Sequence, residues 1–198
     1  MTFRVVVLAS GTGSLFASLV QATQDTFEIT ALITDNSAAG ALAIADRAGV
    51  TRRTVALADY ADRAAWDQAL ATGIAEFRPD LVVSAGFMRV LGPAVLATFP
   101  QRIINTHPAL LPLFPGAHAV RDALAAGVSV TGSTVHVVDA GVDTGPVIAQ
   151  ETVAVLPQDD EAALHERIKS VERRLLLDVV TRIAKHGFTV HDRKVSIA

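Results

Sequence analysis

Residues 3–14 read Phe3-Arg4-Val5-Val6-Val7-Leu8-Ala9-Ser10-Gly11-Thr12-Gly13-Ser14, and this stretch decides the fold class. Its first seven residues form a short β-branched run that is typical of a buried parallel strand. A glycine-containing turn follows, after which Leu15, Leu19 and Val20 recur at helical spacing. A strand, a tight turn and a helix in this order predict the first βα unit of an α/β sheet.

The same alternation of strands and helices continues along the chain. Strands are expected at residues 28–34, 52–56, 81–85, 102–105, 130–138 and 146–155, and helices at residues 38–48, 60–77, 93–99, 119–126 and 161–185. The proline-rich residues 108–116 fit neither element and predict a shaped loop. Because the last two strands are joined by a short connection, we expect them to run antiparallel. The pattern therefore predicts an α/β fold with a doubly wound, mostly parallel sheet, helices on both faces and an antiparallel edge, in a single domain of residues 1–198.

Composition restricts the function classes open to the chain. Its 198 residues hold 17 Lys and Arg against 20 Asp and Glu, a formal net charge of −3. A general electrostatic hold on nucleic acid needs a basic surface, so we expect no nucleic-acid partner. The absence of cysteine excludes disulfides, thiolate metal sites and a cysteine nucleophile. With no apolar run of about 20 residues and no secretory signal, we expect a cytoplasmic protein without a membrane span.

The glycine turn of residues 10–14 is a candidate anion site. Glycines let the backbone approach an anion, and the next helix offers free N–H groups and its positive dipole end. Phe16 replaces the third glycine of a dinucleotide fingerprint, and no Gly-Lys-Ser/Thr follows as in a P-loop. We therefore predict phosphate binding, and the alternative is a tight turn without a ligand. Asp35, after the second strand, keeps a dinucleotide interpretation open.

Asn105-Thr106-His107-Pro108 follows the fifth strand candidate directly and leads into the proline-rich loop. Along an extended segment, Asn105 and His107 point to the same side. An amide and a protonated imidazole can stabilise a developing oxyanion, and the ring can also move a proton. The pair is therefore a candidate acyl-transfer site. The alternative is an Asn and a His that only brace the loop.

Two carboxylates in the turn between the last two strand candidates are candidate partners for His107. Asp139 and Asp143 both lie in this glycine-containing turn. A carboxylate near His107 would stabilise the charged ring and hold its orientation. We favour Asp143, because the Thr144-Gly145-Pro146 that follows makes a tight turn able to aim the side chain, whereas Asp139 is expected to start the turn. The alternative for either Asp is a turn-capping role.

Other kinds of catalytic site have weaker support. No two histidines show ligand spacing on one helix, and a catalytic zinc usually takes three protein ligands. A metal site would need His107, His118 and His136 to converge. A serine hydrolase is disfavoured, because Ser84 does not lie in a Gly-x-Ser-x-Gly sequence.

The last helix candidate carries an array of opposite charges. Its arginines and glutamates include Arg167, Arg173, Arg174, Glu166 and Glu172. Charges three and four residues apart on a helix pair across its surface. We interpret this array as a solvated face.

Five ordered motifs resemble those of the folate-dependent formyltransferases. They run along nearly the whole chain as Ser10-Gly11-Thr12-Gly13-Ser14, Ala85-Gly86-Phe87-Met88-Arg89-Val90-Leu91, Asn105-Thr106-His107-Pro108-Ala109-Leu110-Leu111-Pro112, Phe114-Pro115-Gly116 with His118, and Asp143-Thr144-Gly145-Pro146. Five motifs in order are far more specific than any one of them. The resemblance implies a Rossmann-like formyltransferase fold and an enzyme that transfers a one-carbon formyl group.

The resemblance also implies substrates and the residues that hold them. The cosubstrate would be 10-formyltetrahydrofolate, with no metal required, and the acceptor would be the amine of glycinamide ribonucleotide, formylated by direct attack in purine biosynthesis. The implied catalytic residues are Asn105, His107 and Asp143. The implied ribonucleotide-binding residues are Gly11, Thr12, Gly13, Ser14 and Glu172. The implied folate-binding residues are Arg63, Met88, Arg89, Val90, Leu91, Val138, Asp139 and Ala140, with Phe87 in the core behind them.

Two positions depart from the family's usual pattern. Asn is frequent where this chain has Leu15, and a second His is frequent where it has Val120. Each departure removes a polar side chain. The backbone cradle at the glycine turn is unaffected, so we expect an altered phosphate contact and a retained function.

Several rival functions stay open. Methionyl-tRNA formyltransferases and formyltetrahydrofolate hydrolases share the Asn-x-His and the later Asp, but each carries an added domain for which we expect no room in 198 residues. A hydrolase without that domain, a formyltransferase for another amine and a non-catalytic nucleotide sensor remain as alternatives. An apolar helix face is compatible with a homodimer.

Overall fold

The structure is a computed structural model that describes residues 2–22 and 26–197. These residues group into two compact units, one that ends at Asn105 and one that begins at Thr106. The boundary between the units falls inside strand β5 (Ile103–His107). A single domain over residues 1–198 stays a prediction.

Strands and helices alternate along the first unit. In chain order they are β1 (Phe3–Leu8), α1 (Ser14–Gln21), β2 (Phe27–Thr34), α2 (Gly40–Ala48), β3 (Arg52–Thr54), the short 3₁₀ helix η1 (Leu57–Asp59), α3 (Arg63–Ala75), β4 (Leu81–Ser84) and α4 (Pro93–Thr98), followed by β5. The alternation is the one that the hydrophobic pattern predicts.

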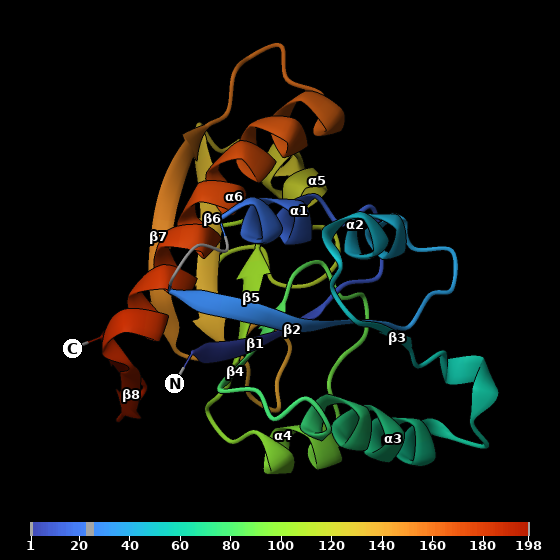
Figure 1. Cartoon of the computed structure of the whole chain (residues 1–198). Helices are drawn as coiled ribbons and strands as arrows, with labels where there is room; N and C mark the ends of the chain where they lie inside the picture. Colours follow the sequence, from blue (N-terminus) through green and yellow to red (C-terminus); the bar gives the residue numbers. More distant parts are fainter. Residues whose placement is uncertain (1, 23–25, 198) are drawn as a thin grey trace. The chain divides into compact units, whose positions relative to one another are not determined.

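The first unit is a doubly wound parallel sheet. Its strand order is β3-β2-β1-β4-β5, and every neighbouring pair runs parallel. Helices α1 and α2 cover one face of this sheet, and α3 and α4 cover the other (Figure 1). The chain leaves β1 first toward β2 and later toward β4, so the order of the strands reverses between β1 and β4. In such sheets, ligands bind beyond the carboxyl ends of the strands at this switch point.

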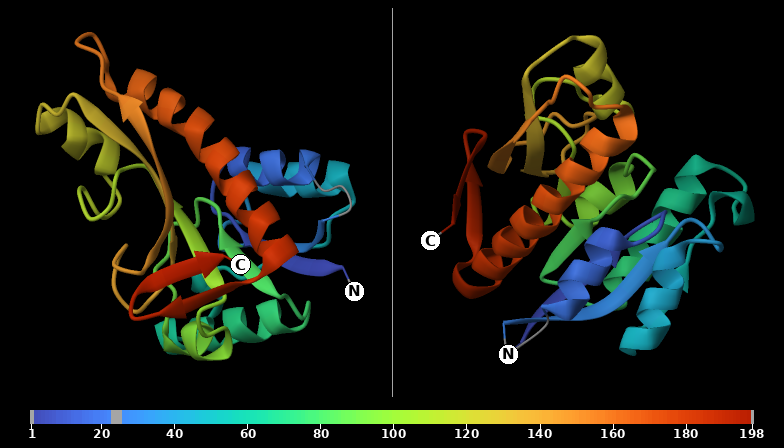
Figure 2. Two further views of the ribbon diagram at one scale, coloured as in Figure 1. Left: turned by 90° about the vertical axis from the view of Figure 1, so that its left-hand side faces the viewer. Right: turned by 90° about the horizontal axis from the view of Figure 1, so that it is seen from above.

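The second unit is built around antiparallel strands and one long helix. Its elements are α5 (Ala119–Ala125), β6 (Val130–Val137), β7 (Val147–Ala154), α6 (Glu161–His186), β8 (Phe188–His191) and β9 (Lys194–Ile197). Strands β6 and β7 pair antiparallel, as do β8 and β9. Helix α6 packs along β6 and β7, and β9 contacts both β7 and α6 (Figure 2). The predicted α/β fold, mostly parallel with an antiparallel edge, is confirmed.

Most boundaries differ from the expected ones by one to three residues. Strand β5 runs on to His107, so this histidine is the last strand residue instead of the start of a loop. Helix α3 begins at Arg63 and not at residue 60, because the carboxylate of Asp62 caps it by accepting a 2.8 Å hydrogen bond from the Ala65 N–H. The C-terminal segment, whose structure the sequence leaves open, forms the β8–β9 hairpin.

Buried side chains explain the two departures from the family pattern. Leu15 lies on the buried face of α1. Val120 belongs to an apolar cluster of the second unit with Val153, Leu164 and Ile168. Both side chains therefore serve the core, where a polar group would need a hydrogen-bond partner.

Within the described residues, no helix combines the length and apolar character needed to cross a bilayer.

Trp66 fixes the interior of the first unit behind the 85–92 segment. Its indole is fully buried, and its Nε1–H donates a 2.8 Å hydrogen bond to the Val55 carbonyl. The ring of Phe87 stacks on it with the centroids 6.4 Å apart. Phe87 therefore belongs to the core, as expected.

Candidate active site

The glycine turn after β1 has the conformation that a phosphate cradle requires. Gly13 caps α1 in the left-handed region at φ 78°, and a Cβ there would meet the Ala41 backbone at 2.7 Å. Only glycine fits this position. Gly11 and Thr12 are exposed, and the N–H groups of the first turn of α1 begin at Ser14. The geometry supports anion binding at Gly11, Thr12, Gly13 and Ser14, which stays a prediction.

Asp35 follows β2, where a dinucleotide site would place its acidic residue, but its carboxylate is buried and already paired. Its side chain is only 4% exposed, and Arg89 Nε lies 2.7 Å from one of its oxygens. The hydroxyl of Ser10 donates to the other oxygen at 2.5 Å. Because the carboxylate is nearly fully buried and both of its oxygens have partners, it offers almost no surface to a ribose, which disfavours the dinucleotide interpretation.

The segment assigned to folate offers an exposed apolar edge beside a cation. Met88 and Val90 are 72% and 54% exposed. The guanidinium of Arg63 donates to the Val90 carbonyl and lies 4.5 Å from the centre of the Trp66 ring. Leu91 is buried, so its side chain packs inward. Exposed apolar side chains of this size mark binding surfaces, and Arg63, Met88 and Val90 are placed to contribute to one.

His107 and Asp143 come together in the second unit. His107 Nδ1 lies 3.3 Å from Asp143 Oδ2, and both side chains are largely buried. The same Asp143 oxygen accepts a 2.8 Å hydrogen bond from the Gly116 N–H. Asn105 lies two residues before His107 in β5, so strand alternation puts both side chains on one side. The preference for Asp143 over Asp139 as the partner of His107 is thus supported by the geometry.

The second nitrogen of His107 faces a backbone carbonyl. His107 Nε2 lies 2.7 Å from the oxygen of Phe114, which can only accept. With a carboxylate at Nδ1 and a carbonyl at Nε2, the ring satisfies both neighbours when it carries two N–H groups. Phe114 itself has a positive φ of 53°. Strained backbone of this kind concentrates at functional sites.

His136 is a second histidine on the same carboxylate, and the sequence suggests it only as a remote metal ligand. Its Nε2 lies 3.5 Å from Asp143 Oδ1. Burial raises the pKa of Asp143, but the hydrogen bond from His136, the Gly116 N–H and the charge of His107 together hold it below its ordinary value. Asp143 therefore stays ionised at neutral pH. Among the described residues, no group of three His, Asp or Glu side chains is arranged to hold a metal ion.

Thr134 and Gln150 anchor the proline-rich loop. Thr134 Oγ1 donates to the Ala109 carbonyl at 2.6 Å and accepts from the Leu111 N–H at 3.1 Å. Gln150 Nε2 donates to the Leu111 carbonyl at 2.8 Å and to Thr134 Oγ1 at 2.9 Å. Two strand side chains thereby fix the part of the loop nearest His107. No local sequence signal marks either residue.

The turn that carries Asp143 is held from both ends. Asp139 accepts hydrogen bonds from the Gly141 N–H at 3.1 Å and from Thr144 Oγ1 at 2.6 Å, which is the turn-starting role expected of it. Arg193 of the C-terminal hairpin donates to the Thr144 carbonyl and lies 3.8 Å from Asp139. Asp143 itself has a positive φ of 55°. The hairpin therefore helps to fix an unusual backbone conformation at the candidate catalytic carboxylate.

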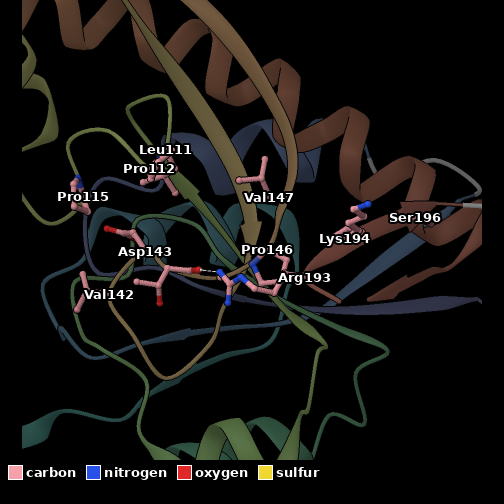
Figure 3. A pocket seen from close by; sticks show the side chains of 13 residues that line it. Leu111, Pro112, Pro115, Val142, Asp143, Pro146, Val147, Arg193, Lys194 and Ser196 are labelled. Carbon is pink, nitrogen blue, oxygen red and sulfur yellow. Dashed lines mark hydrogen bonds between the residues drawn. The ribbon is translucent and has the colours of Figure 1, made fainter. Parts of the chain in front are cut away.

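A cavity of about 830 Å³ lies beside this turn (Figure 3). Its wall comes from the proline-rich loop, the turn and the hairpin, all within the second unit. The lining residues are Leu111, Pro112, Pro115, Val142, Asp143, Thr144, Gly145, Pro146, Val147, Arg193, Lys194, Val195 and Ser196. Val138 and Ala140, assigned to folate together with Asp139, lie in the same turn but do not line this cavity.

Glu172 is buried, so its interpretation as part of a solvated face is wrong. It lies on the inner stripe of α6 with Leu164, Ile168 and Leu176, and it is 4% exposed. Burial raises its pKa to about 7, although a hydrogen bond from Thr106 favours the charged form. Half-buried Arg167 of the same helix donates two hydrogen bonds to the carboxylate of Asp159. A carboxylate at i, i+4 spacing from apolar residues was the available sequence signal.

Replacing Glu172 with Gln is expected to change how stability depends on pH. The folded-state pKa of about 7 lies above the ordinary 4.5. The contribution of protonated Glu172 to the free energy of unfolding is therefore complete below pH 4.5 and is lost as the pH rises toward 7. Glu172→Gln removes this loss, and the variant should gain about 3 kcal/mol on the wild type between pH 4.5 and pH 8. Urea unfolding of both proteins at the two pH values measures the difference.

Glu166→Gln is the matched control, because Glu166 lies exposed on the same helix and Lys169 lowers its pKa. Relative to the wild type, Glu166→Gln should gain no free energy of unfolding as the pH rises. Parallel pH profiles for Glu172→Gln and the wild type would contradict the raised pKa.

Comparison with known proteins adds independent support for the family. The sequence pattern of the formyl transferase family matches residues 3–180. The phosphoribosylglycinamide formyltransferase of Mycobacterium tuberculosis is 55% identical over 196 residues, which cover 98% of this chain and 91% of that protein. The human trifunctional purine biosynthetic protein adenosine-3 is 39% identical over 175 residues, covering 87% of this chain and 17% of that protein.

A solved structure agrees along the whole chain. Glycinamide ribonucleotide transformylase 1 from Symbiobacterium toebii superposes with a TM-score of 0.96 at 39% identity, covering 99% of this chain and 94% of its own. The match extends over both units. With the family's pattern over residues 3–180 and a 55% identical relative along nearly its full length, this chain belongs to the formyl transferase family.

Proposed function

We propose that this enzyme transfers the formyl group of 10-formyltetrahydrofolate to the amine of glycinamide ribonucleotide, a step of purine biosynthesis. The relatives named as phosphoribosylglycinamide formyltransferases support the reaction, since one is 55% identical over 98% of this chain. The observation that carries the proposal is the buried contact of His107 with Asp143, 3.3 Å apart. A charged imidazole held by a carboxylate is what an acyl transfer without a covalent adduct requires.

The transfer would proceed by direct attack. The amine nitrogen forms a bond to the formyl carbon, and the carbonyl electron pair moves onto the oxygen to give a tetrahedral intermediate. Asn105 and protonated His107 stabilise this oxyanion. The bond to the folate nitrogen then breaks, and a proton passes from the former amine to that nitrogen with the help of Asp143 and water. No redox step and no metal enters this scheme.

The contact between His107 and Phe114 adds a condition to this scheme. Because Nδ1 faces Asp143, Nε2 is the nitrogen left for the formyl oxygen, and it now binds the Phe114 carbonyl. The substrate oxygen would therefore replace that carbonyl. Relief of the positive φ at Phe114 would help the loop to give way.

Substrate binding would use the remaining predicted residues. The turn at Gly11, Thr12, Gly13 and Ser14 would hold the ribonucleotide phosphate, and Glu172 would contact the same substrate. The folate would bind Arg63, Met88, Arg89, Val90 and Leu91, the last through its backbone, and the backbone of Val138, Asp139 and Ala140. Exposed Met88 and Val90 beside Arg63 support the folate assignment.

A transfer assay tests the proposal. Purified protein is mixed with 10-formyltetrahydrofolate in the presence of a chelator, and deformylated folate is followed by absorbance with and without glycinamide ribonucleotide. Turnover that depends on the ribonucleotide is the expected result. Release of formate without an acceptor would indicate a hydrolase, and turnover only with another amine would reassign the acceptor. No turnover by folded protein would contradict the proposal and favour a nucleotide sensor.

Arg193 is expected to support the reaction through the turn that holds Asp143. Arg193→Met removes the donor to the Thr144 carbonyl, so kcat should fall about tenfold with little change in either KM, since small misplacements of catalytic groups are costly. Arg193→Lys should restore part of the loss. Lys194→Met, an exposed neighbour on the hairpin, is the control, and equal effects of the two methionine variants would contradict the assignment.

Location and assembly complete the proposal. We place the enzyme in the cytoplasm. Because the chain has no cysteine, it forms no disulfide and does not depend on an oxidising compartment. A homodimer stays a prediction. Light scattering on purified protein measures the mass, and a value of one chain would contradict it.

A further inference from the structure

The carboxylate of Asp35 lies between two loops at the switch point of the first unit. One loop is the glycine turn after β1, and the other is the segment after β4 that contains Met88 and Arg89. The side chain of Asp35 is 4% exposed and comes from the end of β2. It belongs to neither loop but contacts both.

Ser10 connects the first loop to Asp35 and to the second loop. Its hydroxyl has one proton, which goes to Asp35 Oδ1 at 2.5 Å. The same hydroxyl accepts a 2.8 Å hydrogen bond from the Met88 N–H. Since the carboxylate can only accept, it fixes the direction of this chain of hydrogen bonds. The Met88 backbone is thereby held by a side chain from the start of the phosphate turn.

Arg89 completes the connection from the other side. Its Nε donates to Asp35 Oδ2 at 2.7 Å. The backbone adds a 3.1 Å hydrogen bond from the Ser10 N–H to the Gly86 carbonyl, and Asn36 Nδ2 donates to the Ser10 carbonyl at 3.1 Å. Every one of these contacts lies within the first unit. Buried networks in which each member has its partners are rigid and hold one arrangement.

We infer that Asp35 is a positioning residue that sets the glycine turn and the Met88–Arg89 segment together, so that the two substrate sites share one support. This inference rests on the proposed function for the identity of the two ligands. At 4% exposure, the Asp35 side chain has almost no surface to offer either ligand. Its loss therefore weakens the binding of both substrates together and leaves the chemistry at saturation nearly unchanged.

Hydrogen exchange without substrates tests whether Asp35 holds the glycine turn and the Met88–Arg89 segment in place. Asp35→Asn keeps an acceptor for Ser10 but sets an amide N–H₂ against Arg89, and Ser10→Ala removes only the hydroxyl. In both variants, amide exchange at residues 11–14 and 87–90 should become about tenfold faster, with the protection of β1 and β2 unchanged. Glu28→Gln, which breaks a half-exposed 2.8 Å ion pair with Arg4 in the same unit, is the control and should change neither loop.

Steady-state kinetics tests the consequence for function. In Ser10→Ala and Asp35→Asn, KM for the ribonucleotide and for the folate should each rise about fivefold or more, with kcat within about twofold of the wild type. A rise in one KM alone, or a fall in kcat at unchanged KM, would overturn the inference. Faster exchange throughout the unit would also overturn it, because Asp35 would then only stabilise the fold.

The two experiments separate this inference from the proposed function. If no ribonucleotide-dependent transfer is found but both loops exchange faster, the shared support stands and the identity of the ligands is wrong. If transfer is found and only one loop responds, the proposed function stands and the shared support is wrong. Ser10→Ala keeps the ion pair of buried Asp35 with half-exposed Arg89 intact and so covers the case in which Asp35→Asn does not fold.

Discussion

Asp143→Asn is expected to lower kcat for formyl transfer about 10³-fold while the ribonucleotide still binds. The carboxylate is the partner of both His107 and His136, and an amide cannot stabilise a charged ring in the same way. Losing the group that orients and charges a catalytic imidazole costs about 10² to 10⁴ in rate. Stopped assays at saturating substrates measure kcat, and calorimetry measures ribonucleotide binding.

The control for this prediction is a half-exposed Asp of the same unit. Asp122→Asn, in α5, breaks only a surface pair with Arg121 and should keep kcat within about twofold. A thermal melt of each variant shows whether the fold is intact. Nearly normal turnover in Asp143→Asn would remove this carboxylate from the mechanism.

His107→Gln is expected to lower kcat by about 10³ to 10⁴, because it replaces a charged oxyanion donor with a neutral amide and removes the group that moves the proton. Since His107 and Asp143 act as a unit, the double variant should be no slower than the slower single variant. Single-turnover measurements on the three proteins give the required rates. Additive losses would show that the two side chains act separately.

His186→Gln serves as the matched histidine control. His186 lies exposed in the last turn of α6, away from the residues given a catalytic role. Its replacement should leave kcat within about twofold. A comparable loss there would mean that histidine replacement harms the protein in general.

The parts of the site that follow strand ends were predictable from the sequence. Strand runs and glycine turns locate Gly11–Ser14 beyond the end of β1 in the first unit, and His107 and Asp143 at strand ends in the second unit. The order of elements up to α6 followed from apolar spacing together with the positions of glycine and proline. The one error in boundaries that touches the site is the end of β5, which the polar Asn105-Thr106-His107 made too short.

Contacts between distant segments were not predictable in the same way. Thr134 and Gln150, on the paired strands β6 and β7, hold the proline-rich loop through the carbonyls of Ala109 and Leu111. These contacts depend on how the two strands pair, which no local sequence pattern encodes. The position of Asp35 after the second strand fits a ribose-binding acid and a residue that positions the neighbouring loops equally well. Only the Arg89 and Ser10 contacts distinguish them. The sequence indicates a solvated Glu172, which is wrong, because a single carboxylate on an apolar stripe is a weak signal beside several neighbouring arginines.

The position of Trp66 has an optical consequence. It is the one tryptophan of the chain, so all indole emission of this protein arises from a single buried site. Phe87 stacks on that indole, and the guanidinium of Arg63 lies over it while holding the Val90 carbonyl. A pterin that absorbs near the emission band and displaces Arg63 would quench this light. Titration of the unlabelled enzyme in a fluorimeter thus reads out the 87–90 segment directly, with no dye and no engineered reporter.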